Sequence, residues 1–247
     1  MSNDKVSIIT PLYNCEKFIG ETIQSVLKQT YTNWEMIIVD DCSSDNSIKI
    51  VEKINDKRIK LVKLDRNSGA AASRNKGIEI ATGRFIAFID SDDLWKEDKL
   101  EKQINFMTEN NYSFSFSDYE FISENSNRTG KIKKSPLILD YEQQLRYNHI
   151  GCLTAIYDTK TLGKIYMPLI RKRQDYALWL KILKKDVNGY GLQESLAYYR
   201  LRSNSVSSNK LEMVLWNWRL YREVEKKSFI RSAYYLLNNI YQKVFYK

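Results

Sequence analysis

The sequence is poor in the residues that build metal clusters, disulfide frameworks and flexible linkers. It has one histidine, three cysteines, three prolines and nine glycines in 247 residues. A single histidine, His149, cannot form a multi-histidine zinc site, and it leaves acid–base chemistry mainly to Asp, Glu, Lys or Tyr. The cysteines, Cys15, Cys42 and Cys152, form no CxxC pair, so we expect reduced thiols in a cytosolic protein.

The chain also lacks a long hydrophobic run. No stretch approaches the ~18 apolar residues of a membrane span, and residues 1–14 show no signal-peptide pattern. We therefore expect a protein that is neither secreted nor membrane-spanning. With 43% hydrophobic and 28% charged residues, the sequence is typical of a globular protein. The net charge of +9 favours an anionic partner, such as a nucleotide, a nucleic acid or a membrane surface, over an uninvolved basic surface.

Short apolar runs alternate with helical patterns through the first 110 residues. Repeats of strand, helix and strand predict an α/β fold in which helices cover a parallel sheet. Buried strands are expected at residues 6–10, 34–40, 59–64 and 84–90.

The alternation weakens after about Asn125. Residues 112–121 predict a half-exposed strand, and residues 123–136 predict a polar, basic and mobile loop. Residues 175–185 predict a short amphipathic helix, and the chain from Lys210 onward is expected to be helical, aromatic and basic.

Polar residues follow three of the expected strands at their carboxyl ends, where open parallel sheets bind ligands. The first strand runs into residues 10–14 (TPLYN), the second ends in Asp40 and Asp41, and the fourth ends in residues 90–93 (DSDD). We expect these three ends to converge on one rim of the sheet.

Asp90 and Asp92 predict a metal site at this rim. Their spacing places both carboxylates on the same side of an extended chain, where they repel each other unless a cation intervenes. Oxygen ligands suit Mn²⁺ or Mg²⁺, with water and a diphosphate completing the coordination. The alternative is an Asp-rich turn that caps a helix over residues 94–110, and a lone DxD pattern does not decide between the two.

Two further residues suit a nucleotide. Asp41 follows a buried strand, where an acid can accept hydrogen bonds from a base or ribose, although it can equally cap a helix over residues 44–54. Arg74, in the small-residue segment 67–77, can pair with phosphate oxygens. Neither GxGxxG nor GxxxxGK[ST] occurs, so the sequence has no dinucleotide fingerprint and no P-loop.

Taken together, these motifs resemble those of glycosyltransferase family 2. The similarity is carried by residues 6–47 (VSIITPLYN to DDCSSDNS) and 67–95 (NSGAAASRNKG to DSDDLW), and it is dense over residues 5–110. It resumes at residues 173–183 (RQDYALWLKIL) and 196–208 (LAYYRLRSNSVSS). Members of this family are inverting, sugar-nucleotide-dependent enzymes with the GT-A fold.

The resemblance implies a Rossmann-like, nucleotide-sugar-binding sheet flanked by helices. Residues 1–209 would form the catalytic domain, with residues 1–110 as its nucleotide-binding half and residues 111–209 as its acceptor half. Residues 210–247 would form an amphipathic C-terminal tail.

The resemblance also implies roles for individual residues. Asp175 matches the general base, and Asp90 and Asp92 match the residues that hold the donor diphosphate through a metal. The expected nucleotide-binding set comprises Thr10, Pro11, Tyr13, Asp40, Asp41, Arg74, Asp90, Ser91 and Arg202.

The sequence departs from the family pattern at two positions. Relatives often carry Glu-Asp at the base, whereas this chain has Gln174 before Asp175 and so retains the second acid. Arg202 stands where relatives often have a histidine. An arginine cannot ligate a cation but can pair with a diphosphate, so this departure concerns the strength of metal binding and not the reaction type.

The sequence thus predicts an inverting, metal-dependent hexosyltransferase. It would move a sugar from a nucleotide sugar, expected to be a UDP-sugar, to a glycan or lipid-linked saccharide in bacterial surface polysaccharide synthesis (lipopolysaccharide, capsule or O-antigen). One alternative is a sugar-phosphate nucleotidyltransferase, which usually has a glycine-rich loop where this chain has none before Gly20. Another is a non-enzymatic nucleic-acid binder, against which the acid cluster argues, so we expect no nucleic-acid partner.

The tail is expected to bind the inner face of the cell membrane peripherally. Residues 210–247 hold eight Lys or Arg and three Glu, a net charge of +5, and anionic lipid attracts such a segment. The alternative, also open, is that the tail packs on the catalytic domain or on a second copy in a homodimer. The expected apolar and ring-bearing positions are Met213, Trp216, Leu220, Val224, Phe229, Ala233, Leu236, Ile240 and Val244, with Tyr234, Tyr235, Tyr241 and Tyr246.

Overall fold

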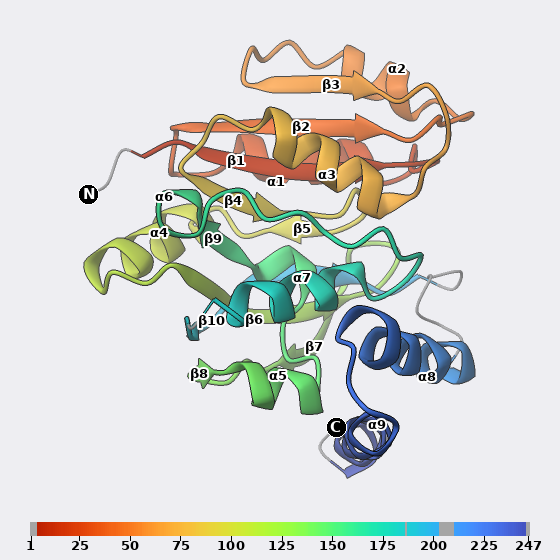
Figure 1. Ribbon diagram of the computed structural model, residues 1–247. Helices are drawn as coiled ribbons and strands as arrows, with labels where there is room; N and C mark the ends of the chain where they lie inside the picture. The colour runs from red at the N-terminus through yellow and green to blue at the C-terminus, as the bar shows by residue number, and fades with distance from the viewer. Residues whose placement is uncertain (1–3, 186, 203–209, 246–247) are drawn as a thin grey trace.

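The computed structural model describes residues 4–185, 187–202 and 210–245, and the tail side chains of residues 212–243. Its centre is one mixed sheet in the order β3-β2-β1-β4-β9-β6-β10-β5, with β7 paired to β6 and β8 to β10 (Figure 1). The strands are β1 (Val6–Leu12), β2 (Trp34–Asp40), β3 (Ile59–Lys63), β4 (Phe85–Phe88), β5 (Leu94–Trp95), β6 (Phe114–Ile122), β7 (Arg128–Lys133), β8 (Ile138–Leu139), β9 (Ile156–Asp158) and β10 (Gly189–Arg200).

Helices cover both faces of this sheet and continue into the tail. The helices are α1 (Ile19–Leu27), α2 (Ser47–Glu52), α3 (Ala70–Ile80), α4 (Lys99–Glu109), α5 (Tyr141–Arg146), the 3₁₀ turn η1 (Cys152–Thr154), α6 (Thr159–Leu162), α7 (Gln174–Leu183), α8 (Lys210–Arg219), the π-helical turn η2 (Leu220–Val224) and α9 (Phe229–Phe245).

The first half of the chain forms the predicted parallel sheet. β3, β2, β1 and β4 run parallel, and every residue of β2 is buried, as expected for a strand covered on both faces. Ile8 of β1 belongs to the core beneath α1 and α4, and its neighbour Ile9 to the core beneath α3 and α7. Figure 1 shows α3 and α7 on the near face and α1 behind the sheet. The predicted α/β fold is confirmed.

Gly77 lets α3 pack closely on β1. A Cβ atom at this position would lie 2.7 Å from Cγ2 of Ile9, closer than packed carbon atoms approach. The close packing of α3 also sets the position of Arg74, which lies one turn earlier on the same helix and is buried.

Two predictions for the second half of the chain were wrong. The strand predicted as half-exposed is β6, and it is largely buried because β9 and β10 flank it. The segment predicted as a mobile loop, residues 123–136, contains β7, which pairs with β6. Arg128 of β7 forms an ion pair with Glu120 of β6 at 2.7 Å. A polar strand at the sheet edge has the composition of a loop, which explains why a loop was predicted here.

The tail is helical, as predicted, but one of its predicted membrane faces packs on the protein. Leu220, Tyr221 and Tyr235 are buried in a cluster with Leu145 of α5 and Tyr176 of α7. Met213 is also buried. For Met213, Leu220 and Tyr235 the structure thus shows the second alternative, burial within the protein, because periodicity identifies an apolar face but not what covers it. The side chain of Val244 and residue Tyr246 lie outside the described part.

None of the helices within the described residues is long and apolar enough to cross a bilayer.

Glu35 of β2 is expected to contribute to stability in a pH-dependent way. Its buried carboxylate accepts hydrogen bonds from Ser7 Oγ (2.7 Å), Thr82 N (2.8 Å) and Lys60 Nζ (2.8 Å), which outweigh the cost of burial and lower its pKa. A lowered pKa in the folded protein adds stability at pH values above about 4.3, the pKa of a glutamate in the unfolded chain. This stability is lost as the pH falls below that value. Glu35→Gln should therefore lower the free energy of unfolding by ~2 kcal/mol at neutral pH, and by less in acid.

Urea denaturation at neutral pH and near pH 3.5 measures both effects. Glu52→Gln is the control, because the Glu52–Lys63 ion pair is about half exposed and should change stability by less than ~0.5 kcal/mol. If Glu35→Gln lowered the free energy of unfolding by the same amount at both pH values, the lowered pKa of Glu35 would be contradicted.

Candidate active site

The carboxyl ends of β1, β2 and β4 lie side by side, as the sequence predicted. Leu12 of β1 is opposite Asp40 of β2, and Asp41 N donates to Leu12 O at 2.8 Å. On the other side of β1, Ile89 N donates to Ile9 O at 3.2 Å. The arrowheads of β1, β2 and β3 point to the same side of the molecule in Figure 1. The residues that follow these strands therefore share one rim.

The end of β1 places Thr10, Pro11 and Tyr13 at this rim. Thr10 is buried, and its Oγ1 has no hydrogen-bond partner among the described residues. Pro11 is partly buried, and the Tyr13 ring is exposed. The exposed ring is accessible to a planar ligand group.

The two aspartates after β2 have different surroundings. Asp40 is buried, and its Oδ2 accepts a hydrogen bond from Ser43 N at 3.1 Å, whereas Oδ1 has no partner in the described chain. Asp41 accepts hydrogen bonds from Ser68 N (2.7 Å) and Gly69 N (2.8 Å). Asp41 therefore holds the loop before α3 and does not cap the helix over residues 44–54. Asp40 is the residue that keeps an oxygen unpaired.

The segment after β4 turns instead of remaining extended. Asp93 N donates to Asp90 O at 3.1 Å, so the geometry expected from the spacing of Asp90 and Asp92 was wrong. Each of these two carboxylates pairs with an arginine. Arg74 Nη2 donates to Asp90 Oδ1, and Arg202 Nη1 donates to Asp92 Oδ2 at 2.9 Å.

Burial and neighbouring charges shift the pKa values of the ionisable groups at this loop. Burial and then the charge of Asp90 raise the pKa of Asp92, against the opposing effect of Arg202. Burial alone would lower the pKa of Arg74, but the nearby Asp90 carboxylate outweighs it and raises that pKa. The two arginines thus neutralise a pair of neighbouring carboxylates.

The residues at this rim fit a divalent cation that arrives together with a diphosphate. Asp90 and Asp92 are partly exposed, and carboxylate oxygens suit Mg²⁺ or Mn²⁺. Within the described ranges, however, no group of three or more His, Cys, Asp or Glu side chains could hold a metal ion. The protein can therefore contribute two carboxylates, and the remaining ligands must come from the diphosphate and from water.

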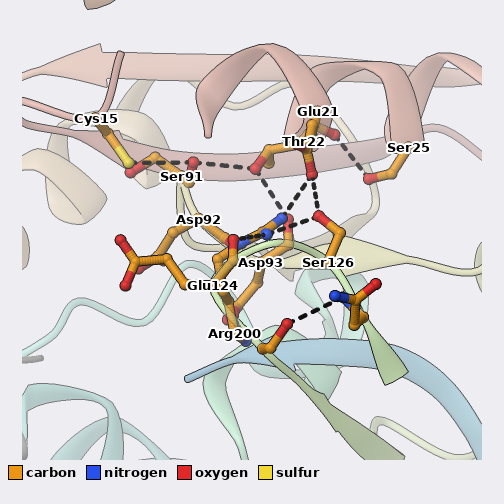
Figure 2. A network of polar contacts seen from close by, with 12 residues as sticks. Cys15, Glu21, Thr22, Ser25, Ser91, Asp92, Asp93, Glu124, Ser126 and Arg200 are labelled. Carbon is orange, nitrogen blue, oxygen red and sulfur yellow. Dashed lines mark hydrogen bonds and ion pairs between the residues drawn. The ribbon is translucent and has the colours of Figure 1, made fainter. Parts of the chain in front are cut away.

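A buried arginine that sequence reasoning missed holds this loop in place. Arg200 Nε donates to Asp92 O (2.7 Å), and Nη1 donates to Glu124 O (2.8 Å) and Ser126 Oγ (2.7 Å). Nη2 pairs with Glu21 of α1 at 2.8 Å (Figure 2). One guanidinium thus links the acidic loop, the β6–β7 turn and α1.

Further hydrogen bonds hold the acidic loop, and several of them involve backbone atoms. Arg200 N donates to Asp93 Oδ1 at 2.9 Å, and Thr22 Oγ1 lies within hydrogen-bond distance of Ser91 O (3.0 Å) and Asp93 O (2.9 Å). Cys15 Sγ lies 3.4 Å from Ser91 O (Figure 2). No sequence signal distinguishes these residues, because Arg200 and Glu21 lie 179 residues apart. The role of Ser91 in nucleotide binding stays a prediction.

Asp175 lies near the acidic loop, although it comes from a different part of the chain. It is the second residue of α7, and the N-cap of this helix is Arg173. Its side chain is partly exposed, and no described residue hydrogen-bonds to its carboxylate. Trp179, one turn further along α7, packs against Phe88 of β4, the strand that leads into the acidic loop, with ring centroids 5.6 Å apart. α7 therefore packs on the strand that carries this loop, and Asp175 at the start of α7 is open to a ligand.

His149 does not take part in this arrangement. Burial and the nearby Lys133 lower the pKa of His149 to about 4, and its ring packs against Tyr147 at 5.0 Å. All three cysteines are free thiols, as expected.

Comparison with known proteins identifies the family. The profile described as Glycosyl transferase family 2 matches residues 7–163. The chain belongs to this family. The resemblance inferred from the motifs is thereby confirmed, and the protein is a glycosyltransferase, in agreement with the main prediction and not with the nucleotidyltransferase or nucleic-acid alternatives.

Two relatives in this family align along nearly the whole chain. A putative teichuronic acid biosynthesis glycosyltransferase, TuaG of Bacillus subtilis (strain 168), is 48% identical over 93% of this chain and 92% of its own. WfgD of Escherichia coli, named a UDP-Glc:alpha-D-GlcNAc-diphosphoundecaprenol beta-1,3-glucosyltransferase, is 43% identical over 97% of this chain and 94% of its own.

Solved structures of other proteins share the fold. S. aureus TarS in complex with UDP-GlcNAc superposes with a TM-score of 0.74 at 23% identity, covering 98% of this chain and 73% of that one. The mannosyltransferase PcManGT of Pyrobaculum calidifontis, in complex with GDP-Man and Mn²⁺, gives a TM-score of 0.67 at 16% identity, covering 96% and 70%. At these identities the likeness supports the fold alone.

Proposed function

We propose that this glycosyltransferase inverts the anomeric carbon of a UDP-sugar as it transfers the sugar to a lipid-linked saccharide in bacterial surface polysaccharide synthesis. The observation that supports the proposal is the packing of α7, which begins at Gln174 and Asp175, against Phe88 of β4, the strand that leads into the acidic loop. The names of TuaG and WfgD support the pathway and the acceptor class.

The donor nucleotide occupies the rim formed by β1, β2 and β4. Tyr13 contacts the base with its exposed ring, and Asp40 supports this part of the site from a buried position, where its Oδ1 has no partner among the described residues. Thr10, Pro11 and Asp41 complete this part of the site, with Asp41 acting through the loop that it holds. Arg74, Arg202 and Ser91 lie at the diphosphate, where the guanidinium groups pair with phosphate oxygens.

The acidic loop is proposed to bind Mn²⁺ or Mg²⁺. Asp90 and Asp92 supply the protein ligands, and the cation, when bound, neutralises the charge that grows on the leaving diphosphate. Arg202, which pairs with Asp92 at 2.9 Å, would pair with the diphosphate, because an arginine can contact phosphate but cannot ligate a metal.

Asp175 is proposed to act as the general base. The acceptor hydroxyl oxygen forms a bond to the anomeric carbon from the face opposite the diphosphate, and the bond from that carbon to the diphosphate oxygen breaks. The electron pair of this bond leaves with the diphosphate, and the hydroxyl proton moves to the carboxylate of Asp175. No covalent nucleophile is needed, which suits a site without a histidine base.

The protein is proposed to work in the cytoplasm at the inner face of the cell membrane, where a lipid-linked acceptor is available. A homodimer stays a prediction, as does the division into domain 1–209 and tail 210–247. The lipopolysaccharide, capsule and O-antigen pathways are alternatives within the same class of product.

Thermal stabilisation by a panel of UDP-, GDP- and dTDP-sugars with Mn²⁺ tests the donor. We expect the matching UDP-sugar, at about 100 times its Kd, to raise Tm by roughly 5–10 °C. Transfer to a GlcNAc-diphospholipid analogue, followed by mass spectrometry, tests the acceptor. Release of pyrophosphate from UTP and a sugar phosphate would instead point to a nucleotidyltransferase, and equal stabilisation by all three nucleotide classes would count against UDP.

A further inference from the structure

One face of α9 carries large apolar side chains that the protein leaves exposed. Ile230, Tyr234, Leu237 and Tyr241 follow one another at intervals of four, three and four residues, so they form a single stripe along the helix. Ile230 is 80% exposed and Leu237 is 67% exposed. We call these four residues the α9 apolar face.

The opposite side of α9 is attached to the protein by specific contacts. Tyr235 Oη donates to Glu142 Oε2 of α5 at 2.7 Å, and Asn217 of α8 donates to Asn239 Oδ1 at 2.9 Å. Ser232, Tyr235 and Asn239 are buried at helical spacing. These contacts set the rotation of the helix, so the apolar face is directed outward by the fold itself.

The exposed charge of the tail is mainly basic. Among the described tail residues 212–243, one glutamate is exposed, Glu223, whereas Glu212 and Glu225 pair with Lys172 (2.6 Å) and Lys184 (2.7 Å) of the catalytic domain. The exposed basic residues of the same range are Arg219, Arg222, Lys226, Arg231 and Lys243.

We propose that the α9 apolar face docks on an anionic lipid bilayer, with the helix lying parallel to the membrane surface. An apolar stripe with tyrosines and flanking cations is the pattern of an interfacial helix. The charge also argues against a second copy of this chain as the occupant, because a symmetric contact would bring the same basic residues together. A bilayer containing acidic lipid complements both the apolar stripe and the charge.

The proposed docking surface lies close to the catalytic residues. Tyr221 and Tyr235 of the tail pack against Tyr176 and Ala177 of α7, which directly follow Asp175 in the chain. Lys172, just before α7, pairs with Glu212 of α8. Figure 1 shows α9 at the periphery, beyond α8 and α5.

Vesicle flotation with the full chain tests the proposal, using phosphatidylcholine vesicles with and without phosphatidylglycerol. We expect binding to the anionic vesicles that falls as the salt concentration rises. Ile230→Glu combined with Leu237→Glu should weaken binding roughly 100-fold, because two inserted aliphatic side chains are replaced by anions. Lys226→Gln combined with Arg231→Gln should weaken it roughly 25-fold, at about fivefold for each cation.

Leu137→Glu combined with Ile138→Glu is the matched control, since Leu137 is also 67% exposed but lies outside the tail. This control should bind vesicles as the unmodified chain does. An equal loss in the control, or unchanged binding by Ile230→Glu/Leu237→Glu, would overturn the proposal. A second outcome would also overturn it: the chain forms a dimer without lipid, and Ile230→Glu/Leu237→Glu converts this dimer to a monomer while vesicle binding persists. Neither donor nor acceptor is present, so the result is independent of the proposed reaction.

Discussion

Replacement of Asp175 by asparagine is expected to slow sugar transfer by roughly 10²–10⁴-fold while leaving donor binding intact. Asparagine has nearly the same shape as aspartate but cannot take up the proton of the acceptor hydroxyl. The carboxylate of Asp175 has no hydrogen-bond partner among the described residues, so the substitution breaks no hydrogen bond within this part of the chain. Single-turnover transfer and calorimetric UDP binding measure the two quantities separately.

A structural role for Asp175 predicts a different result. Its negative charge lies in the first turn of α7, where it interacts with the helix dipole by about 0.3–1 kcal/mol. Glu101→Gln removes the same kind of charge from the first turn of α4 and serves as the control. Both variants should unfold at similar temperatures, and only Asp175→Asn should lose transfer. Near-normal turnover by a folded Asp175→Asn protein would refute the assignment as the base.

The second large effect is expected for Asp92→Asn, which should uncouple the binding of Mn²⁺ from the binding of UDP. In the unmodified chain each should raise the affinity of the other, because the protein offers two carboxylates and needs the diphosphate to complete the coordination. Losing one ligand should remove most of this coupling and slow transfer by roughly 10²–10³-fold, since a bound cation supplies several kcal/mol of charge stabilisation.

Calorimetric titration of UDP with and without Mn²⁺ measures the coupling directly. Asp98→Asn is the control, because Asp98 also pairs with a cation, Lys102 at 2.8 Å, but lies on the exposed surface at the start of α4. Unchanged coupling in Asp92→Asn would show that the acidic loop does not share a metal with the nucleotide.

Replacement of Arg202 is expected to change the affinities for Mn²⁺ and for UDP in opposite directions. Because its guanidinium pairs with Asp92, Arg202→Met should strengthen Mn²⁺ binding without nucleotide. The same change should weaken UDP binding by about tenfold, since a charged hydrogen bond to phosphate is lost. A purely structural arginine would not change these two affinities in opposite directions.

The fold of the first half could be predicted because the sequence signals for its strands are local. Apolar runs at β1, β2 and β4 identified strands, and the polar residues after each run identified the rim, since parallel strands place their carboxyl ends together. The strands of the second half were harder to predict. β7 is a polar edge strand, and its composition differs little from that of a loop.

The sequence by itself determined the family, the α/β architecture and the acidic residues expected to carry the chemistry, because these depend on local runs and on the order of motifs. Only the tertiary structure decided which side chains meet. It paired Asp90 with Arg74 and Asp92 with Arg202, and it joined Arg200 to Glu21. The same holds for the tail, where periodicity defines an apolar face, but only the packing of α9 on α5 and α8 decides which face remains exposed to a partner.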